Sequence, residues 1–437
     1  MHKDHSIKID GLTRVEGHGN IVVNIKKGRV EDLRFEITES PRFFEVMLKG
    51  RHYSEAHHIM SRICGICAVS HTSASVKAVE DAMGIRISRQ TRLLRELALC
   101  GEMIQSHILH LYFMVLPDLL GEGSLLPLLQ SEPETAKVGL QIKKTAGEIC
   151  RVVGGRLVHP IAIIPGAMAH LPKIGELKTL KKDLKACLPY LDQALELFQG
   201  FSVPDFSEAV GEALTAKKEF ISLSAPRGYP IYDGEPYSNQ KGPLTIKRYS
   251  RKIIESTVAH STAKHARTKR GSFMVGALAR MNNNYRRLHP EAKAAAKKAG
   301  LDVPCSNPFQ NNMAQLIECF HLTWKAIELI GKLTERGLRK EPQGKPTKYG
   351  RGTGIVEAPR GILYHRYTIS RAGTITSANC MIPTAKNLRR IEEDLRAYVP
   401  TIMELKKEEI RARIEQMVRA FDPCISCSSH IMKVTFK

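Results

Sequence analysis

Residues 62–71 read RICGICAVSH, and this stretch holds a C-x-x-C pair, Cys64 and Cys67. A C-x-x-C pair places two thiols close enough to bind one metal ion, and thiolates select soft or borderline ions. The residues that follow, AVSHTSASVKAVEDAMG (68–84), carry a helical pattern, so we expect the pair at the N-terminus of a helix. There the helix dipole lowers the pKa of a thiol and favours the thiolate, which is the form that binds metal.

A second C-x-x-C pair, Cys424 and Cys427, lies near the other end of the chain in DPCISCSSH (422–430). We interpret Asp422 as the N-cap of a short helical turn whose first residue is a proline. His430 follows three residues after the pair and is a candidate for a further ligand. A site closed by both ends of the chain indicates that metal binding is the purpose of the fold.

Two other uses of the four cysteines are open from the spacing alone. One is a structural zinc site, although structural zinc usually ties together a short segment. The other is a dithiol–disulfide pair, although no thioredoxin-like βαβ pattern surrounds either motif. The remaining cysteines stand alone, mostly in apolar helical surroundings, and we interpret them as buried structural residues. They are Cys100, Cys150, Cys187, Cys305, Cys319 and Cys380.

The composition is that of a soluble globular protein that can bury a sizeable core: of 437 residues, 43% are hydrophobic and 25% charged. The net charge of +22 raises nucleic acid as a partner, but the basic residues are spread through helices and no nucleic-acid-binding motif is visible. We therefore expect no nucleic-acid partner, while an acidic partner subunit remains open. The most apolar stretch, 104–120, is interrupted by polar residues, and residues 1–10 lack an apolar signal region. We expect no transmembrane segment and a cytoplasmic location.

The hydrophobic patterns predict one large α+β domain over residues 1–437, mainly helical, with a central bundle of long helices. Alternating apolar positions predict a β-hairpin in an N-terminal β region, 1–40. Helical periodicity marks a helical core at 60–200 and 246–338, and Pro- and Gly-rich composition marks smaller β and loop islands at 202–245 and 344–384. The helices themselves are expected at 90–116 (ending at Pro117), 134–152, 175–200, 246–268, 310–338 and 385–420.

At its cysteine pairs the chain resembles the large, catalytic subunit of nickel–iron hydrogenases. The stretches RICGICAVSH and DPCISCSSH match the two family signatures. Three further segments agree in order and spacing, so the resemblance covers the chain from end to end. They are RVEGH (14–18), EAPRG (357–361) and TITSANCMIPT (374–384). The resemblance implies heterolytic cleavage and formation of H2 at a nickel–iron centre.

The resemblance implies four thiolate ligands: Cys64 and Cys424 terminal on nickel, Cys67 and Cys427 bridging nickel to iron. The iron of such enzymes carries CO and cyanide in a dry pocket. The guanidinium of an arginine is always charged and has several fixed donors, so it suits a cyanide ligand. The residues implied around the iron are Arg360 and its neighbour Pro359, Thr384 as donor to the other cyanide, and His71 near a bridging sulfur.

Glu16, in RVEGH, resembles the proton-relay glutamate of the family, which contacts the terminal cysteine at the position of Cys424. Burial would raise its pKa, so it could pass a proton near neutral pH. Glu45, the backbone carbonyl of Cys380 and His430 match the second metal site of the family, which usually holds magnesium. Without the motif, Glu16 would read as a surface residue.

Two kinds of observation indicate the branch of the family: a residue that differs from the pattern of membrane-attached members, and motifs that the sequence lacks. Ser106 stands where membrane-attached members tend to carry Asp, which points to the soluble bidirectional, NAD(P)-coupled or sulfhydrogenase branch. There is no ferredoxin-type cysteine run, and Gly352 and Gly354 read as a loop with an incomplete dinucleotide motif. The resemblance therefore implies an iron–sulfur small subunit as electron acceptor, and further iron–sulfur or flavin subunits linked to NAD(P) or sulfur.

Maturation of such subunits implies nickel-insertion proteins and a peptidase that removes a C-terminal extension after the position of His430, here residues 431–437. Three alternatives stay open at this point. One is an electron-transfer scaffold related to the quinone-site subunit of complex I, which lacks the four cysteines. Another is a zinc-structured, nucleic-acid-associated module. The third is a membrane-linked or a deazaflavin- or heterodisulfide-linked hydrogenase branch.

Overall fold

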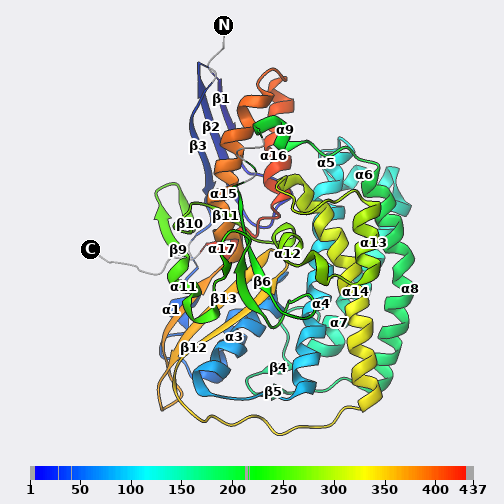
Figure 1. Ribbon diagram of the computed structural model, residues 1–437, viewed down its shortest axis with the longest axis vertical. Helices are drawn as coiled ribbons and strands as arrows, with labels where there is room; N and C mark the ends of the chain where they lie inside the picture. The colour runs from blue at the N-terminus through cyan, green and yellow to red at the C-terminus, as the bar shows by residue number, and fades with distance from the viewer. Residues whose placement is uncertain (1–4, 28, 41, 212–214, 216, 430–437) are drawn as a thin grey trace.

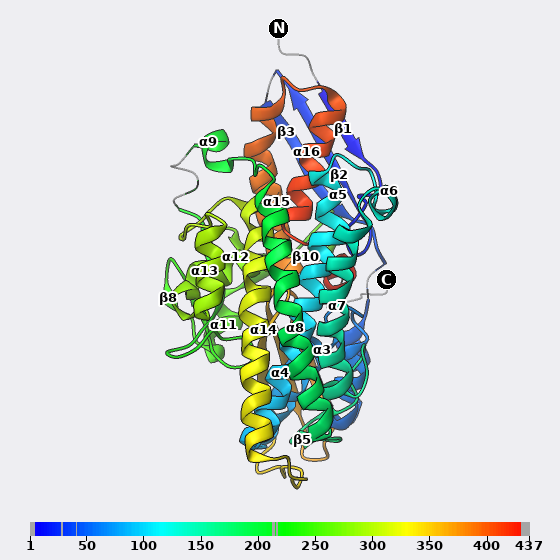
Figure 2. The same ribbon diagram turned by 90° about the vertical axis from the view of Figure 1, so that its right-hand side faces the viewer.

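Long helices lie side by side along the long axis of the molecule (Figures 1 and 2). The structure is a computed structural model that describes residues 5–27, 29–40, 42–211, 215 and 217–429. The bundle helices contact one another as a ring, α4 to α7, α7 to α8, α8 to α14 and α14 to α4. Their bounds are α4 (Arg89–His110), α7 (Pro133–Gly154), α8 (Ile174–Gln199) and α14 (Asn311–Arg336). The expected central bundle of long helices is confirmed.

The helical run that begins at α4 does not end at Pro117, as the sequence suggested. It continues through a π-helical turn (Leu111–Val115) into α5 (Leu116–Leu119), with Pro117 inside α5. The wider turn accommodates the proline ring, which would otherwise meet the carbonyl four residues before it. By length and composition this run of described residues, Arg89–Leu119, could cross a membrane, but 78% of its most apolar window is buried inside the fold, as in a core helix.

The N-terminal β region is a three-stranded antiparallel sheet in the order β1-β2-β3, and it contains the expected hairpin. Its strands are β1 (His5–Ile9), β2 (Gly19–Lys26) and β3 (Arg29–Ile37). Their inward side chains, such as Ile21, Val23 and Phe35, are fully buried. The helix that follows the first cysteine pair is α3 (Ala68–Met83), as expected.

The island at 344–384 forms a second antiparallel sheet in the order β12-β13-β14. Gly352 and Gly354, expected in a loop, lie instead in β12 (Gly350–Ala358), which packs on α3. A Cβ atom on Gly354 would stand 1.9 Å from the carbonyl oxygen of Ala74 in that helix. The glycines therefore allow strand and helix backbones to touch. The other strands are β13 (Gly361–Ile369) and β14 (Ile375–Met381).

The segment 246–268 was expected to be one helix, and this prediction is wrong. Helix α11 (Ile246–Lys252) is short, and β9 (Ile254–Val258) and β10 (Ser261–Arg267) then form an antiparallel hairpin. β-Branched residues such as Ile254, Thr257 and Val258 favour strands over helices, which explains the change. The island at 202–245 contains strands as expected. They are β6 (Glu219–Ser224), β7 (Glu235–Ser238) and β8 (Gly242–Pro243), joined by β11 (Phe273–Met274).

The expected helix at 385–420 is divided near Pro400. It consists of α15 (Pro383–Tyr398), a 3-10 turn (Val399–Ile402) and α16 (Lys407–Ala420), followed by α17 (Ile425–Ser428). The shorter elements are α1 (Phe44–Met47), α2 (Ala56–Ser61), α6 (Leu125–Ser131), α9 (Phe206–Val210), α12 (Ala277–Asn284), α13 (Pro290–Lys298), β4 (Ile163–Ile164) and β5 (Ala167–Met168). Long helices with several small sheets confirm the α+β class.

Candidate metal centre

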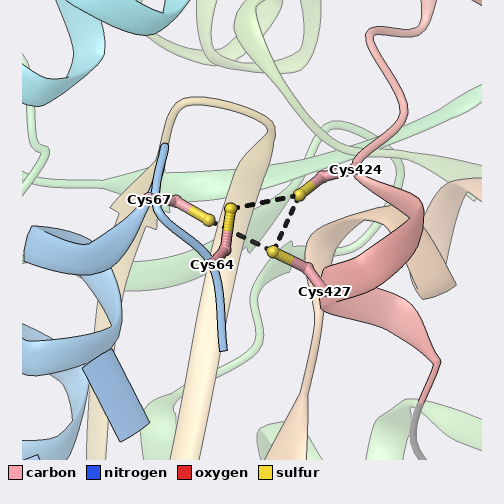
Figure 3. Close-up of side chains that lie close together, drawn as sticks. All are labelled: Cys64, Cys67, Cys424 and Cys427. Atoms are coloured by element: carbon pink, nitrogen blue, oxygen red, sulfur yellow. Dashed lines mark hydrogen bonds between the residues drawn. The ribbon is translucent and has the colours of Figure 1, made fainter. Parts of the chain in front are cut away.

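The four cysteines of the two C-x-x-C pairs meet in the interior, where the N-terminus of α3 faces α17 (Figure 3). Their sulfur atoms all lie within 4.8 Å of one another. The Sγ–Sγ distances are 3.6 Å from Cys64 to Cys424, 3.2 Å from Cys67 to Cys427, and 2.7 Å from Cys424 to Cys427. All four side chains are buried. Four converging thiols in a water-excluded place are a donor set for soft or borderline metal ions.

Because the four thiols are buried against one another, their pKa values shift in different directions. Hydrogen bonds from the neighbouring thiols, Cys424 first, hold the pKa of Cys64 well below its ordinary value, whereas burial raises the pKa of Cys424 and Cys427. Cys67 departs from the expected effect of the helix dipole. Hydrogen bonds with Cys424 and Cys427 favour its thiolate, but the thiol of Cys64, burial and the charge of Cys64 raise its pKa to about 12. A bound cation would favour the thiolate at all four.

Cys67 is the N-cap residue of α3, so the expected position at a helix N-terminus is confirmed. A buried carboxylate of α4, Glu102, holds this end of the helix. It accepts hydrogen bonds from the backbone N–H of Val69 and of Ser70, the latter at 2.9 Å, and from the Ser70 hydroxyl. Burial raises the pKa of Glu102 to about 8. Sequence reasoning missed Glu102, which looks like any other polar residue of an amphipathic helix.

The second pair is held by the N-terminal segment of the chain. Glu16 forms an isolated β-bridge with Cys424, and its backbone oxygen accepts a hydrogen bond from Ile425 N at 2.8 Å. The Glu16 carboxylate accepts a hydrogen bond from Ser426 N at 3.1 Å, and the nearby Cys424 side chain favours its charged form. Burial, and then the charge of Cys64, raise the pKa of Glu16. The structure thus brings Glu16 to the thiols.

Thr384 and Arg360 reach the same place from α15 and from the turn between β12 and β13. The Thr384 hydroxyl accepts a hydrogen bond from Cys424 N at 2.9 Å, so its own proton remains available for a further acceptor. Arg360 is 5% exposed and donates to the Ser106 hydroxyl at 3.1 Å and to the Asp422 carboxylate at 2.7 Å. Burial opposes its charge, but Asp422 and then the neighbouring thiolates raise the pKa of Arg360.

The interpretation of Asp422 as an N-cap is wrong. Helix α17 begins at Ile425 with Cys424 as its N-cap residue, and the Asp422 side chain turns instead toward Arg360. Its other oxygen accepts from Gln315 at 2.9 Å, and its backbone has a positive φ of 50°. A buried cation outcompetes a helix end as partner for a buried carboxylate.

A buried ion-pair network supports the backbone that presents Arg360. Arg280, on α12, donates to Glu318 at 2.6 Å and to Glu357 at 2.9 Å. It also donates to the carbonyl oxygens of Ala358 and Pro359, at 3.0 and 2.9 Å. Arg280 thus holds the backbone carbonyl of Pro359, the residue directly before Arg360. The pattern around Arg280, ARMNNN, contains no motif that could have revealed this role.

A small cavity adjoins the sulfur atoms of Cys67, Cys424 and Cys427. Its other walls are mostly apolar, and their polar members are residues that the sequence singled out. These walls are Ala358, Leu363, Ile382 and Pro383, together with His71, Arg360 and Thr384. A dry pocket with a guanidinium and a hydroxyl at its edge fits small, weakly hydrated ligands with hydrogen-bond acceptors.

His71 lies one helical turn after Cys67 and is buried. Its Nδ1 is 3.2 Å from Nε2 of His365, whose Nδ1 is 2.8 Å from the Tyr367 hydroxyl. Burial lowers the pKa of His71 to about 4, so the imidazole is neutral. A neutral ring can donate to one side and accept from the other, which suits a relay or a positioning contact beside a sulfur.

Of the three residues expected at a second metal site, Glu45 and Cys380 lie in the described part of the chain. Glu45, in α1, is 4% exposed and accepts a hydrogen bond from the backbone N–H of Cys380 at 2.6 Å. Lys264 lies 3.7 Å from the same carboxylate, and burial raises the pKa of Glu45. The structure therefore brings Glu45 and Cys380 together, while His430 lies outside the described residues.

Known proteins resemble this chain over nearly its whole length. The sequence profile of the nickel-dependent hydrogenase family matches residues 42–124 and 229–430, and a profile described as HoxL-like matches residues 6–40. The alpha subunits of sulfhydrogenase 2 and sulfhydrogenase 1 from Pyrococcus furiosus are 34% and 33% identical; the matches cover 98% of this chain and 100% and 98% of those proteins. A crystal structure of an NAD+-reducing [NiFe]-hydrogenase in the H2-reduced state superposes with a TM-score of 0.86 at 27% identity, covering 98% of this chain and 99% of that one. The chain therefore belongs to the nickel-dependent hydrogenase family, as a large subunit and an oxidoreductase that acts on H2.

Proposed function

We propose that the four cysteines hold a nickel–iron centre, with Cys64 and Cys424 as terminal ligands of nickel and Cys67 and Cys427 bridging to iron. The observation that carries the proposal is the buried cluster itself, in which two pairs from opposite ends of the chain bring four sulfur atoms within 4.8 Å of one another. When bound, the centre supplies the redox chemistry that converts H2 into two protons and two electrons. Soft thiolate donors fit both metals.

The cavity beside Cys67 and Cys427 is our proposed place for the CO and cyanide ligands of iron. Its apolar walls exclude water, and Arg360 and Thr384 stand at its edge as donors. Arg360 Nη1 and Nη2 are held by Ser106 and Asp422, so the guanidinium keeps a fixed orientation. His71, on the same wall, would contact a bridging sulfur. Small anionic ligands need such fixed donors because no water can replace them.

Glu16 is our proposed first proton carrier. Glu16 pairs with Cys424 in an isolated β-bridge, and its carboxylate accepts a hydrogen bond from Ser426 N at 3.1 Å. The raised pKa of Glu16, caused by burial first, brings its titration closer to neutral pH, so the side chain can take a proton from the sulfur and release it. The thiolate of Cys424 would act as the base beside nickel.

A second metal ion, magnesium or another divalent cation, is proposed at Glu45, the carbonyl of Cys380 and His430. Carboxylate and carbonyl oxygens are the ligands that magnesium prefers. The buried Glu45 beside Cys380 supports this placement. The ammonium of Lys264 lies 3.7 Å from the Glu45 carboxylate. It would contact this ligand of the ion rather than the ion itself.

We infer a heteromeric, cytoplasmic enzyme of the soluble branch. The relatives are named as alpha subunits of sulfhydrogenases, and the structural neighbour is an NAD+-reducing enzyme, which supports an iron–sulfur small subunit and onward transfer to NAD(P) or sulfur. NAD(P) is a cytoplasmic pool, so the same likeness supports the location. We infer that the chain is one domain, because cysteine pairs from its two ends contribute to a single site.

Maturation is proposed to remove residues 431–437, which lie outside the described part of the chain. A tail after His430 would keep Cys424 and Cys427 from folding inward until nickel is loaded by insertion proteins. Intact-mass measurement on active, nickel-loaded protein decides this point. A mass that still includes Lys437 would show that no peptidase is required.

Metal analysis of cysteine variants tests the proposed function. In the assembled complex we expect one nickel and one iron at the four cysteines of each large subunit. The variants Cys64→Ser and Cys424→Ser should lose nickel and H2 oxidation, because a hydroxyl is a poor ligand compared with a thiolate. Cys187→Ser is the matched control, a buried cysteine of α8 outside the cluster. Nickel retention and normal activity in either cluster variant would reject the ligand assignment.

A further inference from the structure

The β9–β10 hairpin packs against α15 (Figure 1), and two histidines and one glutamate of these segments lie close together there. His260 lies in the turn between the strands, His265 in β10, and Glu392 in α15. One ligand atom from each residue can be chosen so that all lie within 4.8 Å of one another. His260 Nε2 is 2.8 Å from Glu392 Oε1, and His265 Nδ1 is 3.7 Å from Glu392 Oε2.

The hydrogen bonding of this cluster is incomplete. Glu392 Oε1 accepts from His260 and from Phe35 N at 3.0 Å, but within the described chain Oε2 accepts no hydrogen bond, since 3.7 Å is too long for one. His265 is 4% exposed, and its Nε2 is buried without a hydrogen-bond partner among the described residues. Buried polar atoms nearly always have partners. The atom of His265 that faces the carboxylate is Nδ1, 3.7 Å from Glu392 Oε2, and the described contacts give neither of these two atoms a hydrogen bond, so both keep a lone pair for a ligand.

The guanidinium groups beside the cluster have partners outside it. Two arginines of α15 lie nearby, but Arg389 donates to Glu393 at 2.9 Å, and Arg396 donates to backbone carbonyls of β3. Neither guanidinium makes an ion pair with Glu392 among the described contacts.

We propose that His260, His265 and Glu392 bind a divalent transition-metal ion, zinc, at a site separate from the four cysteines. Two imidazoles and one carboxylate are a common ligand set for zinc. Ligands about 2.0–2.2 Å from a tetrahedral ion stand about 3.3 Å from one another, a spacing between the two distances observed here. The fourth position would be taken by water, because His260 and Glu392 are partly exposed.

The ion would tie the hairpin to α15. The same helix begins at Pro383 and presents Thr384 to the backbone of Cys424, and β10 carries Lys264 beside Glu45. Both elements thus also carry residues that contact the proposed hydrogenase site. We assign the ion a structural role, because its ligands come from neighbouring elements and lie outside the cavity beside the cysteines.

The test uses the mature complex loaded with nickel and iron, so that the four cysteines are occupied. The protein is equilibrated with Zn2+ in a chelator-buffered series, and bound zinc is measured by elemental analysis and by X-ray absorption at the zinc edge. We expect one zinc per large subunit with nitrogen and oxygen ligands. The variants His260→Gln and Glu392→Gln should each weaken binding at least tenfold.

His289→Gln is the matched control. His289 also lies beside a carboxylate, Glu328 at 3.8 Å, but among the described residues it belongs to no group of three potential ligands close enough to share one ion. This variant should bind zinc as the parent does. His260 is near the surface, so its variant retains the fold, and unchanged nickel and iron content verifies this. Absence of zinc in the parent, sulfur ligation, or equal binding by His260→Gln and the parent would each overturn the proposal.

Discussion

Two nitrogen atoms of Arg360 hydrogen-bond Asp422: Nη2 donates to the carboxylate oxygen Oδ1 at 2.7 Å, and Nε donates to the backbone oxygen at 2.8 Å. Both residues are buried. Asp422 stands two residues before Cys424, so this pair joins the β12–β13 turn to the segment that carries the second cysteine pair. The orientation of the guanidinium and the position of the thiols are therefore set together.

The variant Arg360→Lys tests the role of these two hydrogen bonds. Lysine keeps the charge but lacks the planar fork, so it can satisfy Ser106 and both Asp422 oxygens only in part. Charge-assisted hydrogen bonds are worth about 1.5–3 kcal/mol each, so we expect kcat for H2 oxidation to fall by about two orders of magnitude. Nickel and iron content should stay unchanged. Arg389→Lys, on the exposed face of α15, serves as control. Turnover at the parent rate would remove Arg360 from the site.

Glu16→Gln should separate metal assembly from proton transfer. The amide can still accept from Ser426 N, so the fold and metal content are expected to persist, but it cannot release a proton. Turnover and H/D exchange with solvent should slow about 100-fold or more. Glu39→Gln is a close control, because Glu39 contacts the Ser426 hydroxyl at 3.1 Å. If exchange in Glu16→Gln matches the parent, protons leave by another route.

Gly354→Ala tests the contact between β12 and α3. The new methyl group would meet the Ala74 carbonyl at 1.9 Å, so the strand or the helix must move. Overpacking of this kind costs about 1–3 kcal/mol or more, and we expect a lower melting temperature together with reduced activity. Gly175→Ala, in α8 and with open space around it, should be neutral or slightly stabilising. Equal stability of Gly354→Ala and the parent would contradict this packing.

The burial of Lys386 should make the free energy of unfolding depend on pH. Lys386 is 1% exposed, and burial lowers its pKa to about 7 from 10.5. Between these values the unfolded chain binds more protons than the folded chain, so the free energy of unfolding rises with pH, by at most about 1.4 kcal/mol per unit. In Lys386→Met this contribution should disappear. Unfolding at pH 7, 8 and 9 measures it, with exposed Lys178→Met as control; an unchanged slope in Lys386→Met would contradict the prediction.

Local patterns predicted the elements whose structure depends on local sequence. The amphipathic periodicity of α7, α8 and α14 was sufficient to place them within about two residues. The segment 246–268 failed because charged residues masked its β-branched positions, which form β9 and β10. The glycines of β12 read as a loop because their partner, α3, lies far away in the sequence.

The site was predictable where a motif named the residue and not where a distant partner decides its role. The four cysteines were identified from sequence, and the structure brings them together. Asp422 looked like a helix cap because Arg360, its actual partner, is 62 residues away. Glu102 and Arg280 carry no motif, and their functions arise only from the backbone groups that the fold places against them.

An infrared spectrum of the purified, assembled complex tests the central claim most directly. If the four cysteines hold a nickel–iron centre in the cavity bounded by Arg360 and Thr384, the spectrum contains bands of metal-bound CO and cyanide, and these bands shift when H2 is added. The same bands should be absent from Cys427→Ser, which removes a proposed bridging ligand, and present in the Cys187→Ser control. An active complex without such bands, or one with zinc at the four sulfurs, would contradict the account.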